Sequence, residues 1–120
     1  MERPTLSPDG RTRIEWGYTD GRMSHEIWAP RIRDAETGEM VLDLWAGEYM
    51  WDAWVEWLEG GVMRLSIREY LDGGITILYV DVDRGDGTFR VDGGEAQPIG
   101  GIQKEVAEAF WRKAKKGPEV

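Results

Sequence analysis

The side chains that could carry out acid–base or nucleophilic chemistry are unevenly represented in this sequence of 120 residues. Aspartate and glutamate together number 23, whereas there is one histidine, His25, and no cysteine. Thiolate chemistry, disulfides and a metal site of several histidines are therefore excluded. His25 stands between Ser24 and Glu26, and adjacent residues of a strand point to opposite faces. We expect a structural or solvent-exposed histidine and predict no catalytic residue.

One carboxylate-rich segment superficially matches a calcium-binding loop. Asp81, Asp83 and Asp86 occur within DVDRGDG at residues 81–87. An EF-hand loop requires an oxygen ligand at its fifth position and glycine at its sixth, and this segment has Gly85 and then Asp86 there. Neither a GxGxxG nor a GxxxxGK phosphate-binding loop occurs in the chain. The sequence therefore predicts a hairpin turn here, with no metal site and no cofactor.

Acidic and aromatic residues are concentrated in the middle of the chain. Residues 44–58 hold four of the seven tryptophans, and no Lys or Arg occurs between Arg33 and Arg64. The acidic residues of this interval are Asp34, Glu36, Glu39, Asp43, Glu48, Asp52, Glu56 and Glu59. The other 15 acidic residues equal the 15 lysines and arginines in number, so this acidic tract accounts for the net charge of -8. The pattern predicts an acidic, aromatic surface.

Tryptophans surrounded by polar groups are typical of the residues that dominate protein interfaces. We therefore predict a partner-binding site formed by Trp45, Glu48, Trp51, Asp52 and Trp54. An acidic surface suits a basic protein partner and opposes the phosphates of nucleic acid. These features favour a non-enzymatic interaction protein, of the kind that immunity and inhibitor proteins represent. A homodimer through the same patch remains an alternative.

The same residues leave a second interpretation open, namely a domain that binds a small molecule or a glycan. Tryptophans can stack on sugar rings, and two carboxylates at the right separation would catalyse hydrolysis of a glycosidic bond. A concave pocket lined by several tryptophans would favour this interpretation, whereas a flat patch would favour a protein partner. Core or half-buried positions are expected for Trp16 and Trp57.

These residues must be positioned by short strands in one domain, residues 1–120. Six or seven strands are expected within about residues 11–92, separated by turns such as SPDG at residues 7–10. Pro30 should mark an edge position or a bulge in the second strand, residues 25–35. No signal peptide and no run of eighteen apolar residues occurs, so a cytoplasmic protein without membrane contact is expected.

Residues 48–59 fit both a helix and a strand. In a helix the acidic residues share one face, whereas in a strand Ala53, Val55 and Trp57 share one side and lead into a hairpin at residues 59–61. We favour the strand because tryptophan favours strands. Residues 102–116 are predicted as the only clear helix, which buries Phe110 and, as a second candidate, Trp111.

The expected fold class is mainly β (α+β), an antiparallel meander, sandwich or partly open barrel with one C-terminal helix packed on it. The SPDGR sequence also resembles the turn that opens strands in TolB-type propellers, although it occurs here once. The order SPDG, MSH, TGE and a Trp-rich segment resembles that of small uncharacterised bacterial all-β proteins. That resemblance implies a shared all-β fold and no known activity.

Overall fold

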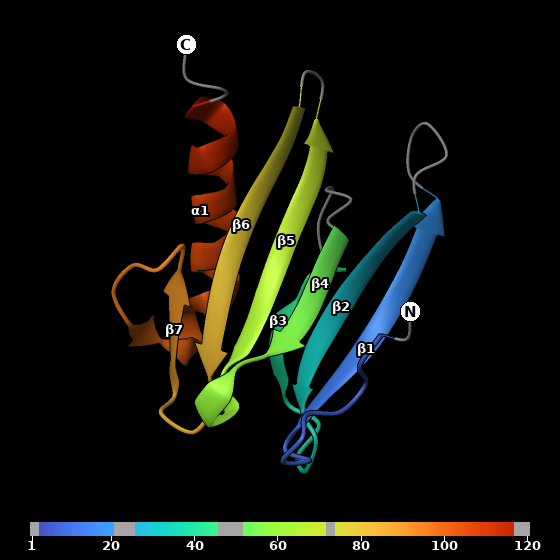
Figure 1. Cartoon of the computed structure of the whole chain (residues 1–120), viewed down its shortest axis with the longest axis vertical. Coiled ribbons are helices and arrows are strands. Elements are labelled where there is room, and N and C mark those ends of the chain that lie inside the picture. Colours follow the sequence, from blue (N-terminus) through green and yellow to red (C-terminus); the bar gives the residue numbers. More distant parts are fainter. Residues whose placement is uncertain (1–2, 21–25, 46–51, 72–73, 117–120) are drawn as a thin grey trace.

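The computed structural model describes residues 3–20, 26–45, 52–71 and 74–116, whose strands form two antiparallel sheets (Figure 1). The first sheet has the order β1-β2-β3 and the second the order β4-β5-β6-β7-β8. The bounds are Thr12–Asp20 for β1, Glu26–Asp34 for β2, Met40–Asp43 for β3, Asp52–Trp57 for β4, Met63–Leu71 for β5, Gly74–Asp83 for β6, Thr88–Val91 for β7 and Gln97–Pro98 for β8. One helix, α1 (Ile102–Lys116), follows β8 after a short 3₁₀ turn, Ile99–Gly101. The predicted mainly β fold with one helix is confirmed, and the described strands do not close into a barrel.

The strand prediction for the ambiguous segment is confirmed over Asp52–Trp57. Val55 and Trp57 share the inner side of β4, and Val55 pairs with Leu65 of β5. The chain then turns through Gly60 and Gly61, both at a φ of 79°, a left-handed conformation that glycine adopts without steric cost. The expected glycine hairpin is thus present. Residues 48–51 lie outside the described part of the chain.

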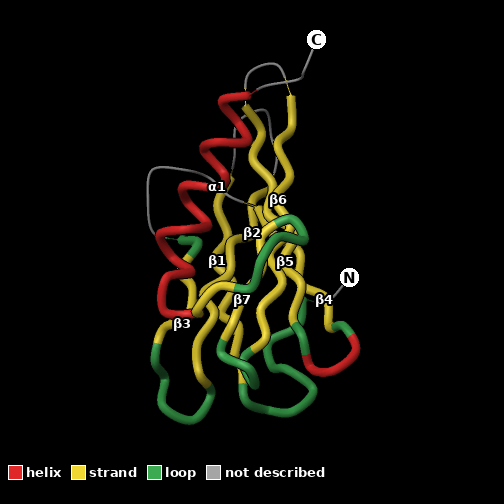
Figure 2. The backbone as a smooth tube through the Cα atoms, turned by 90° about the vertical axis from the view of Figure 1, so that its left-hand side faces the viewer, coloured by secondary structure: helices red, strands yellow, loops and turns green. Residues whose placement is uncertain are grey.

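Helix α1 has the bounds that the sequence predicts and covers one side of the five-stranded sheet (Figure 2). Phe110 is buried as expected, whereas Trp111 is 36% exposed. The start of the helix is attached to β3 by Gln103, whose amide oxygen accepts the Asp43 N–H at 2.8 Å and whose amide nitrogen donates to the Asp43 carbonyl at 3.0 Å. The helix therefore closes the core from the side opposite to Trp54.

The hydrophobic core lies between the inner faces of both sheets and the helix. Ile14 and Ile32 face each other across β1 and β2, and both are buried. The five-stranded sheet contributes Leu65 and Val80, which are fully buried. The strand residues of the core are the alternate residues that the period-two pattern assigns to one side of each strand, and α1 adds Ile102, Val106, Ala109 and Phe110. Trp16 and Trp57 are half-buried against it, as predicted.

Two details differ from the sequence-based expectation. The two-residue strand β8 was not foreseen, because the strands were expected to end at about residue 92. Pro30 lies in β2, the middle strand of its sheet, so the expected edge position is wrong. The ladder between β2 and β3 ends at the pair of Arg31 and Asp43, and Arg31 directly follows Pro30. Just beyond that pair the Pro30 carbonyl accepts the Leu44 N–H at 3.1 Å, so the proline lacks only the donor half of the pairing there. The register between β2 and β3 shifts instead between Ile32 and Arg33, where Val41 of β3 is the additional residue.

Arg84, just after β6, joins the two sheets at the end where the β2–β3 and β6–β7 turns lie, which we call the turn end. Its guanidinium donates to the Arg11 carbonyl at 3.0 Å and to the Thr12 hydroxyl at 2.9 Å, and it pairs with the Asp34 carboxylate. Three bonds from one side chain thus connect β6 to β1 and β2. Within the described residues, no helix has the length and apolar character needed to cross a membrane.

Candidate functional site

Asp52, the first residue of β4, is a buried anchor rather than an exposed acid. Its residue exposure is 6%, and its carboxylate accepts the backbone N–H of Trp28 in β2 at 2.9 Å. Arg68, its cross-strand partner in β5, approaches the same carboxylate at 3.8 Å. Because the Asp52 carboxylate binds the Trp28 N–H of the other sheet as well as Arg68, it fixes β4 against β2. The structure therefore assigns this predicted site residue a positioning role.

Trp54 lies two residues further along β4 and is 39% exposed. Its cross-strand neighbours are Ser66 in β5 and then Tyr79 in β6, which is 45% exposed. These three residues form a row across the outer face of the five-stranded sheet, opposite the face that α1 covers. We call it the aromatic row. On the same face, two residues along β5 and β6 from Ser66 and Tyr79, Arg64 binds Asp81 through two hydrogen bonds of 2.7 and 2.9 Å.

Trp54 also belongs to a cluster at the junction of the sheets, which we call the tryptophan cluster. Its members are Arg3, Trp16, Trp28 and Trp54. The guanidinium carbon of Arg3 lies 4.2 Å from the ring centre of Trp28, 5.5 Å from that of Trp54 and 5.6 Å from that of Trp16. Tyr18 stands beside the cluster, with its ring centre 4.9 Å from that of Trp28. The indole N–H of Trp16 donates to the Pro4 carbonyl at 2.7 Å.

Trp45 lies on a different surface, the outer face of the three-stranded sheet. Its indole N–H donates to the Ala29 carbonyl, and the guanidinium carbon of Arg31 lies 3.8 Å from its ring centre. A Cβ atom added to Gly17 would approach this ring to 2.5 Å. Trp45 is 37% exposed, but its polar atom is already bonded within the fold. The structure thus separates Trp45 from Asp52 and Trp54.

The remaining two predicted site residues, Glu48 and Trp51, lie outside the described residues, as does His25. The structure therefore brings together Asp52 and Trp54 of the predicted set. It adds neighbours that sequence reasoning missed: Arg3, Trp28, Arg68 and Tyr79. The alternation of β4 indicates which residues share a face with Trp54, but no local signal shows that Arg3 reaches this strand.

The acidic tract is partly neutralised by arginines from other parts of the sequence. Three of its acids form ion pairs, which are Asp34 with Arg84, Asp43 with Arg31 at 3.3 Å, and Asp52 with Arg68 at 3.8 Å. Glu36, Glu39, Glu56 and Glu59 are exposed instead. For these four glutamates, no ion pair with another described residue is found. The tract therefore contributes both structural ion pairs and exposed negative charge.

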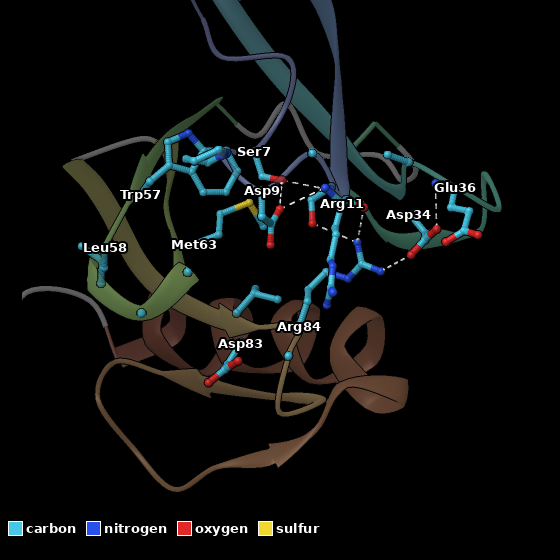
Figure 3. A pocket seen from close by; sticks show the side chains of 18 residues that line it. Ser7, Asp9, Arg11, Asp34, Glu36, Trp57, Leu58, Met63, Asp83 and Arg84 are labelled. Atoms are coloured by element: carbon cyan, nitrogen blue, oxygen red, sulfur yellow. Dashed lines mark hydrogen bonds and ion pairs between the residues drawn. The ribbon is translucent and has the colours of Figure 1, made fainter.

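A pocket of about 640 Å³ opens between the sheets at their turn end, away from the tryptophan cluster (Figure 3). Trp57 and Met63 line it on one side, and Arg84 lines it on the other. Its carboxylates include Asp9, which accepts the Ser7 hydroxyl at 2.5 Å. This bond, together with the Arg11 N–H, lowers the pKa of Asp9.

Asp34 also lines this pocket and has a strongly lowered pKa of about 2. The main cause is the backbone N–H of Thr37, followed by the Arg84 guanidinium. A general acid in glycoside hydrolysis requires the opposite shift, a carboxyl group that keeps its proton near neutral pH. Asp9 and Asp34 are therefore suited to hold the turns in place and not to donate protons.

The aspartates of the DVDRGDG segment have structural partners. Asp81 is paired with Arg64, and the Asp83 carboxylate accepts the Asp86 N–H at 3.0 Å, which closes the turn between β6 and β7. Among the described residues, no group of three or more His, Cys, Asp or Glu side chains is placed to hold a metal ion. The predicted hairpin turn is present at this position.

Comparison with known proteins does not assign the chain to a family. No family model, no curated protein and no solved structure matches it.

Proposed function

We propose that this protein is a non-enzymatic interaction module that binds a basic protein partner through the surface around Trp54. The observation that carries the proposal is the aromatic row, in which Trp54 and Tyr79 are 39% and 45% exposed on the sheet face opposite the helix. Large aromatic side chains of this kind dominate binding energy in protein interfaces. Proteins that act as immunity factors or inhibitors of a basic target would use such a surface.

Charge supports a basic partner. The chain has a net charge of -8, and exposed Glu56 and Glu59 lie at the lower end of β4 and in its following turn. Complementary charge increases the rate of encounter and selects against wrong partners. Arg64 and Arg68 lie on the same face, but they are engaged with Asp81 and Asp52. The proposal includes a cytoplasmic location and does not involve nucleic acid.

The form of the aromatic surface supports a protein partner over a small molecule or a glycan. Trp54, Ser66 and Tyr79 extend across three neighbouring strands of a sheet face. The pocket between the sheets has one tryptophan, Trp57, and two carboxylates whose pKa values are lowered. Ligand pockets that recognise sugars usually combine several aromatic walls with convergent polar groups.

The test is capture of a partner by immobilised wild-type chain and by variants of the aromatic row. Trp54→Ala and Tyr79→Ala should each lose at least about tenfold in affinity, since interface hot spots contribute about 2 kcal/mol or more. The captured protein should have an isoelectric point above about 9 and should be released by salt. Trp111→Ala, which removes an equally exposed tryptophan on the helix, is the matched control.

Two results would contradict the proposal. The first is retention of the same proteins by the wild type and both aromatic-row variants, with circular dichroism showing that all are folded. The second is loss of structure in Trp54→Ala, because Trp54 would then be needed for the fold. A dimer of the chain that Trp54→Ala converts to monomer would indicate that the surface joins two copies instead.

A further inference from the structure

Arg3 occupies an unusual position, because three tryptophan rings from three different strands surround its guanidinium. Trp16 belongs to β1, Trp28 to β2 and Trp54 to β4, and their ring centres lie between 4.2 and 5.6 Å from the guanidinium carbon. The Nε of Arg3 is buried and has no hydrogen-bond partner. Among the described residues, no carboxylate pairs with this arginine. Within the part of the chain that the structure describes, its guanidinium therefore contacts tryptophan rings and forms no ion pair.

We propose that Trp16, Trp28 and Trp54 form a cation-binding aromatic cage, which Arg3 of the chain itself fills and which accepts a cationic side chain of the protein partner in exchange. The faces of tryptophan rings carry negative charge and attract guanidinium and ammonium groups most strongly when these are removed from water. The ligand class is an arginine or lysine side chain. This inference rests on the proposed function and names the group that the basic partner would insert.

The attachment of Arg3 permits exchange. The chain is bonded to β1 through the Thr5 carbonyl, which accepts the Ile14 N–H at 2.9 Å, and through the Pro4 carbonyl, which accepts the Trp16 indole N–H at 2.7 Å. Arg3 precedes both bonds, so its side chain can leave the cage while they remain. No described hydrogen bond to Arg3 must break.

The second arginine at this site behaves differently. The guanidinium carbon of Arg68 lies 5.4 Å from the Trp54 ring centre, but this side chain is also paired with buried Asp52 at 3.8 Å. Asp52 in turn holds the Trp28 N–H. Arg68 is therefore part of the wall that positions Trp28 and Trp54. Arg3 is the cation that can be replaced, because no ion pair with a described residue holds it and its buried Nε has no hydrogen-bond partner.

The experiment uses the full chain and tetramethylammonium chloride as a probe, because this ion binds ring faces and cannot donate a hydrogen bond. Arg3→Gln removes the resident charge. Indole ¹H–¹⁵N resonances of Trp16, Trp28 and Trp54 are followed during titration, with sodium chloride at equal ionic strength as the reference. Arg3→Gln should bind the probe at least roughly tenfold more tightly than the wild type, since an emptied cage has no competing cation.

The cage is tested by adding a second substitution to Arg3→Gln. Trp28→Ala removes the ring nearest to Arg3 and should abolish the response, whereas Trp111→Ala on the helix should leave it unchanged. The proposal is overturned if folded Arg3→Gln responds equally to both salts. It is also overturned if Arg3→Gln unfolds by circular dichroism, because Arg3 would then be a structural member of the core.

The outcome separates the cage from the proposed function. If the chain captures a basic partner in a Trp54-dependent way while Arg3→Gln does not bind tetramethylammonium, the aromatic surface is the interface and the cage is wrong. If Arg3→Gln binds the probe and no basic partner is captured, the cage exists and the proposed function fails. If the cage and the proposed function are both correct, Arg3→Gln should also bind the captured partner more tightly than the wild type does.

Discussion

The indole ring of Trp45 occupies the space that a side chain at position 17 would need. Gly17 and Trp45 are far apart in the sequence, yet a Cβ at position 17 would lie 2.5 to 2.8 Å from three atoms of the ring. The ring is also fixed by the Ala29 carbonyl and by Arg31. Trp45 is therefore a packed element of the outer sheet face, although its exposure of 37% resembles that of Trp54.

Gly17→Ala should lower the free energy of unfolding by about 1–3 kcal/mol, the usual cost of forcing an additional group into a filled space. Urea denaturation measures the change. In the Trp45→Ala background the same substitution should cost much less, because the ring that the new methyl group meets is absent.

Gly100→Ala is the matched control for this pair, because a Cβ at that position would meet nothing within 4 Å. Equal effects of Gly17→Ala in the wild type and in Trp45→Ala would show that Trp45 does not set the requirement for glycine. Urea denaturation of the wild type, Gly17→Ala, Trp45→Ala, the double variant and Gly100→Ala decides the question.

At the scale of elements, local pattern predicts most of the fold. The boundaries of α1 follow from its apolar stripe and from the glycines and proline that flank it, and the hairpins follow from glycine-containing turns. Period-two alternation also places Val55 inward and Trp54 outward in β4. These features depend on residues that are neighbours in sequence, so they can be predicted from local sequence patterns.

The features that the sequence did not predict depend on contacts between distant segments. Asp52 shares the outward side of β4 with Trp54 by alternation, but β2 covers it and gives it the Trp28 N–H. Likewise, Arg3 enters the tryptophan cluster only because β1, β2 and β4 meet at one place. Alternation therefore predicts the outward side of Trp54, while the neighbours of Trp54 required the fold.

The turn between β2 and β3 is held by Asp34, and this gives the fold a defined acid sensitivity. The pKa of Asp34 is lowered from 3.8 to about 2 by the backbone N–H of Thr37 and by Arg84. A carboxyl group with a lowered pKa in the folded state stabilises the fold fully above its ordinary pKa. This stabilisation is lost as the pH falls through about 2.

Asp34→Asn should therefore flatten the loss of stability between about pH 4 and pH 2, because asparagine keeps an acceptor for the turn but does not titrate. Thermal unfolding at several pH values measures this dependence. Glu39→Gln, on the same turn and exposed, is the control and should retain the wild-type profile. An unchanged profile for Asp34→Asn would mean that another group dominates acid unfolding.

At the scale of the whole molecule, three regions have separate tasks. The helix covers the core on one side of the five-stranded sheet, the aromatic row faces outward on the other, and the turn end holds the sheets together. The tryptophan cluster lies at the junction of the two sheets, so its geometry depends on how they are joined. A binding surface at such a junction requires that the sheets keep a fixed relation to each other.

Arg84 is the side chain expected to maintain that relation at the turn end. It donates to the Arg11 carbonyl, the Thr12 hydroxyl and the Asp34 carboxylate. Arg84→Ala should lower the free energy of unfolding by about 1.5–3 kcal/mol, the range for hydrogen bonds that involve charged groups. Amide hydrogen exchange should show a greater loss of protection in β1 than in β5, because β1 loses its bonds to Arg84 while the β5 ladder is intact.

Arg11→Ala is the matched control, because Arg84 binds the backbone of Arg11 and the Arg11 side chain is exposed. This substitution should change the free energy of unfolding by no more than about 0.5 kcal/mol. Equal stability and equal exchange in the two variants would show that the sheets are held together by their shared core alone, and the tryptophan cluster would then keep its geometry without Arg84.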